Sequence, residues 1–144
     1  MFTRAERDYI AQNPLGRIAV STPDGKPHAV PLFTRIEGDK VICTGFNMAK
    51  SYKYRVVQKN PWVAVVWDSR LPTPPPNIAG IEVRGTAVIK HDPGASDAHF
   101  EVTPTKVFSW GINEDPATSF EKKMGFDMKH QRAGAREGAP DRKD

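Results

Sequence analysis

Short apolar runs separated by strong turn signals place the tightest limit on how this chain of 144 residues can fold. Pro23-Asp24-Gly25-Lys26 combines a proline that fixes φ, an aspartate that bonds the backbone and a glycine suited to the left-handed position. Glu37-Gly38-Asp39 is a second signal of this kind. Such turns favour antiparallel hairpins over parallel β-α-β units. About six short strands with these turns predict a small, mainly β barrel.

The segments between the turns have the composition of strands. Residues 80–90 alternate apolar and polar side chains, which is typical of a strand with one buried face. Pro31 lies inside another apolar run and indicates an edge, a bulge or a place where the ladder opens. The predicted strands are residues 16–22, 27–34, 40–45, 62–68, 80–90, 100–102 and 105–111, the last two separated by Pro104. Residues 69–79 contain four prolines and are predicted to form a loop.

Two helices are expected. Residues 3–13 form an amphipathic pattern in which Thr3 and Glu6 match a capping box, and Pro14 ends it. The second helix covers residues 48–59, with Asn47 as its N-cap and Asn60-Pro61 as its stop. Met48, Tyr52 and Val56 share one stripe of that helix, so we expect them to face the barrel.

Length and composition predict one domain in residues 1–113, followed by a flexible, charged tail in residues 114–144. The net charge is +4 and the sequence pI is about 9.3. Part of this excess belongs to the tail, so it is weak evidence for nucleic-acid binding and equally fits a pocket for an anionic cofactor. A basic nucleic-acid-binding barrel, with Trp62 as a stacking residue, is the remote alternative, and we expect no nucleic-acid partner.

The single cysteine, Cys43, lies in an apolar run and is expected to be a buried, inert thiol. One cysteine permits neither an internal disulfide nor a zinc cluster, so a reducing cytoplasm is the simplest location. The N-terminal residues have no apolar core of signal-peptide length, and no apolar stretch approaches the roughly 20 residues that span a bilayer. We therefore expect no membrane partner, and no metal site.

The segment from Ile42 to Pro61 carries the strongest functional pattern. A strand ends at Thr44-Gly45, and the short helix that follows carries Ser51, Lys53 and Arg55. Backbone N–H groups of a first helical turn, together with a lysine, can hold a phosphate. The alternative is that Lys50, Lys53, Arg55 and Lys59 form only a solvated basic face.

Other residues are less specific. His28 could be a general acid, a cofactor contact or a structural group. Trp110 either packs in a core or interface, or forms the wall of a pocket for a flat aromatic ligand. The sequence contains no nucleophile elbow, Walker loop or dinucleotide fingerprint.

Four segments in order resemble the flavin-binding split-barrel superfamily that contains pyridoxamine 5′-phosphate oxidase. They are Pro14 to Val20 with Pro23 to His28, Ser51-x-Lys53 before Asn60-Pro61, Ile81 to Ala87, and Pro104 to Gly111. Within the superfamily the chain looks most like small actinobacterial deazaflavin (coenzyme F420)-dependent enzymes, which close with a similar Ser-Trp-Gly segment. The resemblance implies a six-stranded antiparallel split β-barrel and a homodimer, with the cofactor ring in the cleft between subunits.

By the same resemblance, Ser51 and Lys53 would bind the cofactor phosphate, and Val30 and Pro31 would place backbone near the ring edge. The implied cofactor-binding residues are His28, Val30, Pro31, Thr44, Gly45, Lys50, Ser51, Lys53, Arg55 and Trp110. Two features depart from the oxidases: Tyr52 replaces an arginine, and residues 28–33 replace an Arg-x-Val-Leu-Leu-Lys strand. The missing cations favour F420 over tightly held FMN and argue against vitamin B6 oxidase activity.

The expected function is an F420-dependent oxidoreductase that transfers hydride to or from a small organic molecule, with no catalytic side chain required. An FMN-binding oxidoreductase of the same fold is the first alternative. A non-catalytic protein that stores a cofactor, or binds haem or another tetrapyrrole through His28, is the second.

Overall fold

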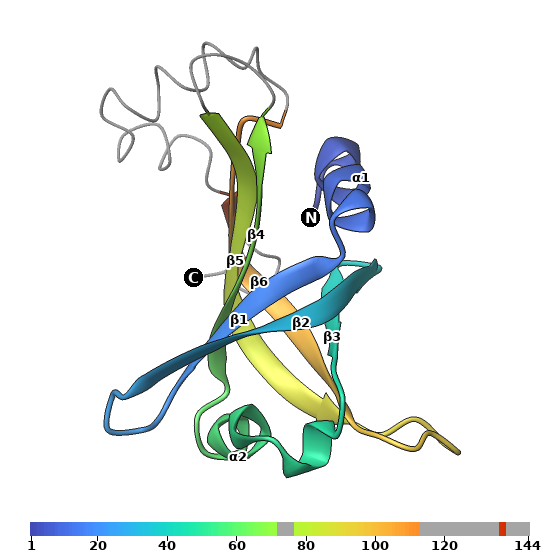
Figure 1. Cartoon of the computed structure of the whole chain (residues 1–144), viewed down its shortest axis with the longest axis vertical. Coiled ribbons are helices and arrows are strands. Elements are labelled where there is room, and N and C mark those ends of the chain that lie inside the picture. The colour runs from blue at the N-terminus through green and yellow to red at the C-terminus, as the bar shows by residue number, and fades with distance from the viewer. Residues whose placement is uncertain (72–76, 113–135, 138–144) are drawn as a thin grey trace.

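The computed structural model describes residues 1–71, 77–112 and 136–137, and most of this part is β-structure (Figure 1). Two α-helices and one short 3-10 helix accompany the strands. The strands are β1 (Leu15–Ser21), β2 (Pro27–Glu37), β3 (Lys40–Thr44), β4 (Trp62–Leu71), β5 (Asn77–Lys90), β6 (His99–Trp110) and β7 (Arg136–Glu137), and the helices are α1 (Arg4–Gln12), η1 (Met48–Lys50) and α2 (Tyr52–Lys59).

Six antiparallel strands close into a barrel, as the sequence predicts. Their order is β3-β2-β1-β4-β5-β6, and β3 returns to pair with β6. The closing contact places Val41 opposite Val102 and Cys43 opposite Phe100. Because all four of these side chains are fully buried, the seam is held by packing as well as by the strand ladder.

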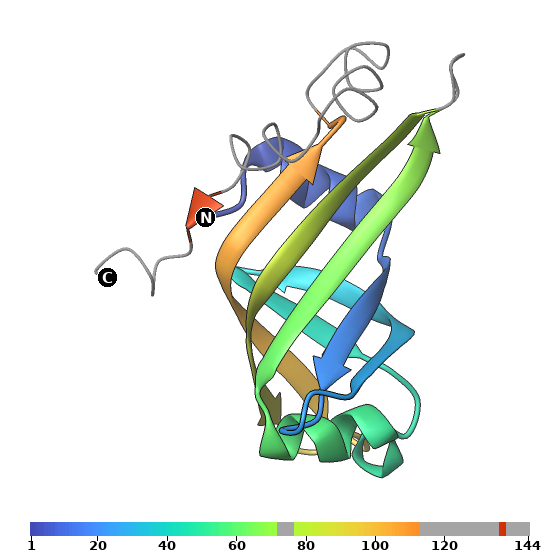
Figure 2. The same ribbon diagram turned by 90° about the vertical axis from the view of Figure 1, so that its left-hand side faces the viewer.

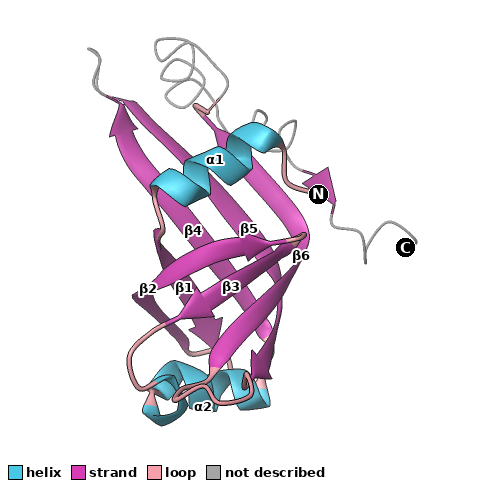
Figure 3. Ribbon diagram, turned by 90° about the vertical axis from the view of Figure 1, so that its right-hand side faces the viewer, coloured by secondary structure: helices cyan, strands magenta, loops and turns pink. Residues whose placement is uncertain are grey.

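The barrel is split because β2 and β3 share only part of their length. They pair from Phe33↔Thr44 to Glu37↔Lys40, next to the turn at Gly38. Beyond Phe33 the two strands diverge, and residues 45–59 cross the end of the barrel between them (Figures 1 and 3). Helix α2 contacts β1 and β5 there and buries Val56 and Val57.

Helix α1 lies at the opposite end and begins with the predicted capping box. The Thr3 hydroxyl accepts from the Glu6 N–H, and the Glu6 carboxylate accepts from the Thr3 N–H. Arg7 then donates to the Gly38 carbonyl, which fixes α1 to the β2–β3 turn. Neither helix in the described part of the chain is long and apolar enough to cross a bilayer.

The predicted break at Pro104 is wrong, because β6 continues through it. The register of β5 and β6 shifts between Arg84 and Gly85, and Gly85 lies opposite Pro104. A Cβ on Gly85 would lie 2.1 Å from the Thr103 carbonyl oxygen, so only glycine permits this approach. The bulge therefore absorbs a proline that would otherwise interrupt the ladder.

The predicted loop at 69–79 is also too long. Residues Ser69 to Leu71 pair with Asn77 to Ala79 and extend the β4–β5 hairpin. Residues 72–76, which include all four prolines of that segment, lie outside the described residues. So does most of the predicted flexible tail, although β7 pairs Arg136 with Val107 on β6.

Candidate functional site

The turn after β3 differs from the predicted single helix. Asn47 has a left-handed φ of 51° and caps nothing with its side chain. The 3-10 turn η1 follows, and α2 begins only after Ser51, which has extended backbone. Asparagine tolerates the left-handed region, so here it reverses the chain instead of starting a helix. The predicted N-cap at Asn47 is therefore wrong, and Ser51 takes that role.

Ser51 uses its hydroxyl group within the turn. The Oγ atom donates to the Met48 carbonyl at 2.6 Å and accepts from the Tyr54 N–H at 3.3 Å. The first bond closes the 3-10 turn, and the second satisfies an N–H at the start of α2. Ser51 therefore joins the two helical segments that carry Lys50 and Lys53.

Asp97, which the sequence analysis did not single out, anchors the same turn from the β5–β6 connection. Its carboxylate accepts from the N–H of Met48 at 2.8 Å and of Ala49 at 3.4 Å. The Met48 bond is the main cause that lowers the pKa of Asp97, because it favours the charged form. Since Asp97 is 49 residues from Met48, no local sequence signal reveals this contact.

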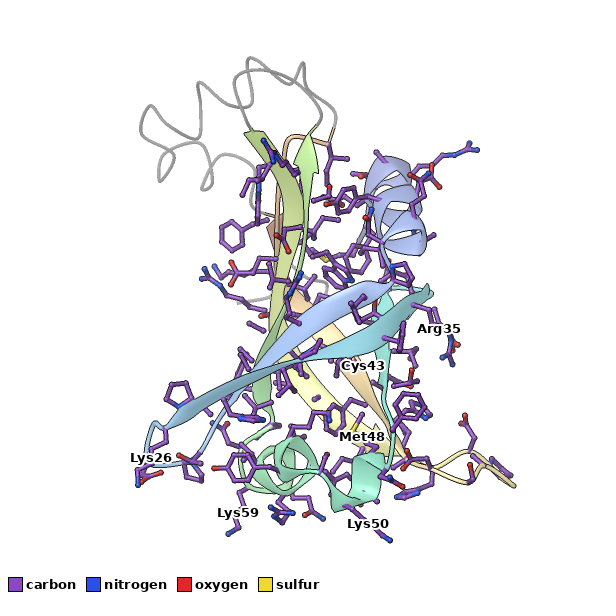
Figure 4. The ribbon with its side chains drawn as sticks, viewed as in Figure 1. Lys26, Arg35, Cys43, Met48, Lys50 and Lys59 are labelled. Atoms are coloured by element: carbon purple, nitrogen blue, oxygen red, sulfur yellow. The ribbon has the colours of Figure 1, made fainter. Side chains whose placement is uncertain are left out.

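Four cations surround the turn, and they are not equivalent. Lys53 is half-buried, and its ammonium nitrogen lies 3.9 Å from the point that a Cβ on Gly45 would occupy. Lys50, Arg55 and Lys59 are exposed, and Lys50 and Lys59 point away from the barrel (Figure 4). In the described residues no carboxylate forms an ion pair with any of the four. Among the residues that the structure describes, Lys53 beside Gly45 is thus a positive charge without a counter-ion.

Tyr52 was expected to face the barrel, but it does not. The break at Ser51 rotates it away from the stripe of Met48 and Val56, and its side chain is 45% exposed. Its ring meets His28 edge to face with centroids 4.9 Å apart, and the Arg55 guanidinium lies 5.6 Å above it. His28 on β2 is therefore brought to the same end of the barrel as Lys53 and Arg55.

The strand face outside the barrel carries a groove of about 340 Å³. Strands β1, β4, β5 and β6 form most of its floor and face the viewer in Figure 2. The groove is lined by Arg17, Ile18, Ala19, Ala29, Ala64, Val66, Glu82, Phe108 and Trp110. Its lining combines small apolar side chains with two aromatic ones, Phe108 and Trp110.

Trp110 reaches this groove because Gly80 lies beneath it. A Cβ on Gly80 would be 2.6 Å from the indole ring, so the ring lies directly on the β5 backbone. Around the groove Arg17 pairs with Asp68, and Arg84 pairs with Glu82 while lying 4.7 Å over the Phe108 ring. Trp110 therefore lines a groove, while its predicted role beside a flat aromatic ligand stays a prediction, and no residue of α2 lines this groove.

The Cys43 thiol is shielded from solvent. Cys43 is buried, and desolvation raises the pKa of its thiol to about 12. In the described part of the chain, no three His, Cys, Asp or Glu side chains gather closely enough to hold a metal ion. None of the residues that line the groove belongs to α2, so the cations around Ser51 and the aromatic side chains of the groove are two separate features of the described residues.

Comparison with known proteins agrees with the barrel fold. A family model described as pyridoxamine 5′-phosphate oxidase matches residues 2–127. The chain belongs to this family. The chain is similar in sequence to the 5a,11a-dehydrotetracycline/5a,11a-dehydrooxytetracycline reductase of Streptomyces rimosus subsp. rimosus. It is 30% identical over 125 residues, which cover 81% of this chain and 88% of the reductase.

Solved structures share the family fold at low identity. The Group A Streptococcus protein HupZ superposes with a TM-score of 0.64 at 17% identity, covering 81% of this chain and 98% of that one. A FAD-binding protein from Mesorhizobium loti gives a TM-score of 0.58 at 19% identity, covering 74% and 92%. At these identities the likeness establishes the barrel fold alone.

Proposed function

We propose that the protein is an oxidoreductase that binds the deazaflavin coenzyme F420 and transfers hydride between it and a small organic molecule. The observation that carries this proposal is the half-buried Lys53 beside Gly45 at the split end of the barrel, which pairs with no carboxylate of the described residues. A phosphate bound there would supply the missing counter-ion, and a charge-assisted contact is stronger when it is partly desolvated.

The residues present fit an anionic, ring-bearing cofactor. Lys53 would hold the phosphate, and exposed Lys50 and Arg55 would meet further negative charge. Tyr52 offers a ring where the oxidases carry arginine, so the site has one cation fewer for a phosphate monoester. This difference favours F420, whose phosphate is a diester, over FMN.

When bound, the cofactor would supply hydride chemistry that no side chain of the protein can perform. The chain would contribute binding, orientation and exclusion of water. Lys53 and the Ser51 turn would hold one end of the cofactor, while Asp97 keeps that turn in place. The Streptomyces rimosus relative acts on a polycyclic molecule by its name. We extend this to the present chain and propose a polycyclic acceptor with a conjugated carbonyl.

We further propose that the protein is a homodimer through the outer groove. The groove exposes Ala19, Ala64 and Val66 beside Trp110, and an apolar surface of this kind is typical of an interface. A ring held along β2 would then be covered by the second subunit. Sedimentation of the wild-type protein and of Val66→Lys tests this: a dimer that becomes a folded monomer in the variant supports it.

Titration of the purified protein with F420 and with FMN, followed by fluorescence, tests the cofactor. Saturable binding of F420 at micromolar concentration, tighter than that of FMN, is the expected result. Absence of F420 binding overturns the proposal. A yellow protein that retains FMN through purification would favour the alternative of an FMN-binding oxidoreductase. The family match and the FAD-binding protein of similar fold support that alternative. Cofactor binding without turnover of quinones or enones would indicate a storage protein.

A further inference from the structure

The connection between β5 and β6 reaches the turn after β3 through one side chain, Asp97. Its carboxylate accepts from three backbone N–H groups: that of Met48 at 2.8 Å, that of Ala98 at 2.9 Å and that of Ala49 at 3.4 Å. One oxygen takes the Met48 N–H, and the other takes the remaining two. Both oxygens of the side chain therefore act as acceptors.

This arrangement requires a carboxylate at position 97. An ionised aspartate has two acceptor oxygens, whereas asparagine has one oxygen and one NH2 group that only donates. In either orientation of an asparagine, the NH2 group would face the N–H of Met48 or the N–H of Ala98, and two donors do not bond to each other. A substitution that keeps the size and shape of Asp97 therefore leaves one of these N–H groups without its acceptor.

Met48 is the point at which this contact reaches the cations. While Asp97 holds its N–H, its carbonyl accepts from the hydroxyl group and the N–H of Ser51, at 2.6 and 3.0 Å. Its side chain is fully buried, and the terminal methyl group lies 3.9 Å from the point that a Cβ on Gly45 would occupy. The Lys53 ammonium lies at the same distance from that point. A shift of Met48 would therefore move Gly45 and the start of α2 relative to each other.

The turn needs such a hold because of its backbone at Asn47. With a φ of 51°, Asn47 is the one residue other than glycine that has a positive φ in the described part of the chain. Asparagine tolerates this region better than most residues, yet the conformation persists where the surroundings fix it. Asp97 bonds to the two N–H groups that follow Asn47. The residue that fixes the turn thus comes from another hairpin.

We propose that Asp97 is a positioning residue for the anionic group of the ligand: it holds Met48 so that Gly45 and Lys53 keep the separation that the anion requires. This role rests on the proposed function and deepens it, because it names what sets the affinity of that site. The β5–β6 connection then controls ligand binding through the turn, without contact to the ligand.

The charge of Asp97 separates this role from simple electrostatics. A carboxylate in the turn repels an anion, so removal of its charge would by itself tighten binding. Loss of positioning would weaken binding. Asp97→Asn removes both the charge and the second acceptor oxygen, and its two effects have opposite signs. The proposal requires that the affinity falls although the site becomes more positive.

Fluorescence titration with F420, or with FMN if wild type binds only FMN, tests this at a temperature well below the unfolding of each variant. The Kd of Asp97→Asn should be about tenfold that of wild type. Val107→Ala, which opens a cavity behind β6 and outside the turn, should lose stability but keep the wild-type Kd. An equal or lower Kd in Asp97→Asn would overturn the proposal, and so would an equal rise in Val107→Ala.

Amide hydrogen exchange by NMR gives a second readout that needs no variant. The Met48 N–H of wild type should be protected at neutral pH both without ligand and at saturation with the cofactor. A Met48 amide that exchanges quickly in either state overturns the proposal, and this result decides if Asp97→Asn does not fold. If wild type binds neither F420 nor FMN, the proposed function fails and this role with it. If wild type binds and Asp97→Asn binds equally well, only the positioning role fails.

Discussion

The imidazole ring of His28 meets the phenol ring of Tyr52 edge to face, with ring centroids 4.9 Å apart and planes at 84°. This contact joins the uncovered part of β2 to the first residue of α2. Tyr52 also lies under the Arg55 guanidinium. The Tyr52 ring thus lies between His28 on β2 and the Arg55 guanidinium on α2.

Tyr52 is therefore expected to decide between cofactors. Tyr52→Arg adds a cation beside Lys53, so the affinity for FMN should rise about tenfold while that for F420 changes less. Fluorescence titration of both cofactors measures the ratio. Tyr52→Phe keeps the ring and the His28 contact, and its ratio should equal that of wild type. An unchanged ratio in Tyr52→Arg would show that the side chain does not reach the phosphate.

Lys53 should contribute more to cofactor binding than its neighbours do. Lys53→Ala removes the half-buried charge beside Gly45, and we expect a loss of about 1–3 kcal/mol in binding free energy. Lys59→Ala is the matched control, because Lys59 lies exposed in the last turn of the same helix. If both variants lose equally little binding free energy, the cations of α2 form only a solvated basic face.

Ser51 should be important for stability whether or not cofactor is bound. Ser51→Ala removes the side-chain cap of α2 and the bond to the Met48 carbonyl, so the free energy of unfolding should fall by about 1 kcal/mol. Chemical denaturation of the ligand-free protein measures it. Ser51→Thr retains the hydroxyl group and should recover most of the loss. A stable Ser51→Ala protein would mean that the turn is held mainly by Asp97.

Asp97 should make stability depend on pH in acid. The Met48 N–H lowers its pKa in the folded protein, so its contribution is present above the unfolded pKa of about 4. That contribution is lost as the pH falls through the lower, folded pKa. Asp97→Asn should therefore be less stable than wild type near neutral pH, and the difference should shrink in acid. Unfolding curves from neutral to acid pH measure the difference in free energy of unfolding between the two proteins. If that difference does not change with pH, the loss of stability does not come from the charge of Asp97.

Local signals in the sequence predicted correctly wherever one short segment decides the structure. The Thr3–Glu6 capping box forms as expected, and Pro31 marks the place where the β2 ladder opens. Both follow from the chemistry of one or two residues. The barrel itself follows from turn signals and alternation, because these fix hairpins without knowledge of distant contacts.

The incorrect predictions involve competition between residues or distant partners. Asn47 and Ser51 are both good N-caps, and sequence alone does not show that Asp97 holds Met48 so that the turn closes before Ser51. Pro104 signals a break unless Gly85, on another strand, provides the bulge opposite it. The groove wall at Trp110 likewise depends on Gly80 in a neighbouring strand.

The uncovered edge of β2 has a consequence for handling the protein without its ligand. Exposed strand edges are templates for strand addition by another chain, which leads to aggregation. Pro27 and Pro31 have no N–H to donate to such a ladder, so they interrupt it at two positions four residues apart. Replacing them with residues that carry an N–H would complete the edge, and we expect the resulting protein to form insoluble assemblies on storage where the natural sequence remains dispersed.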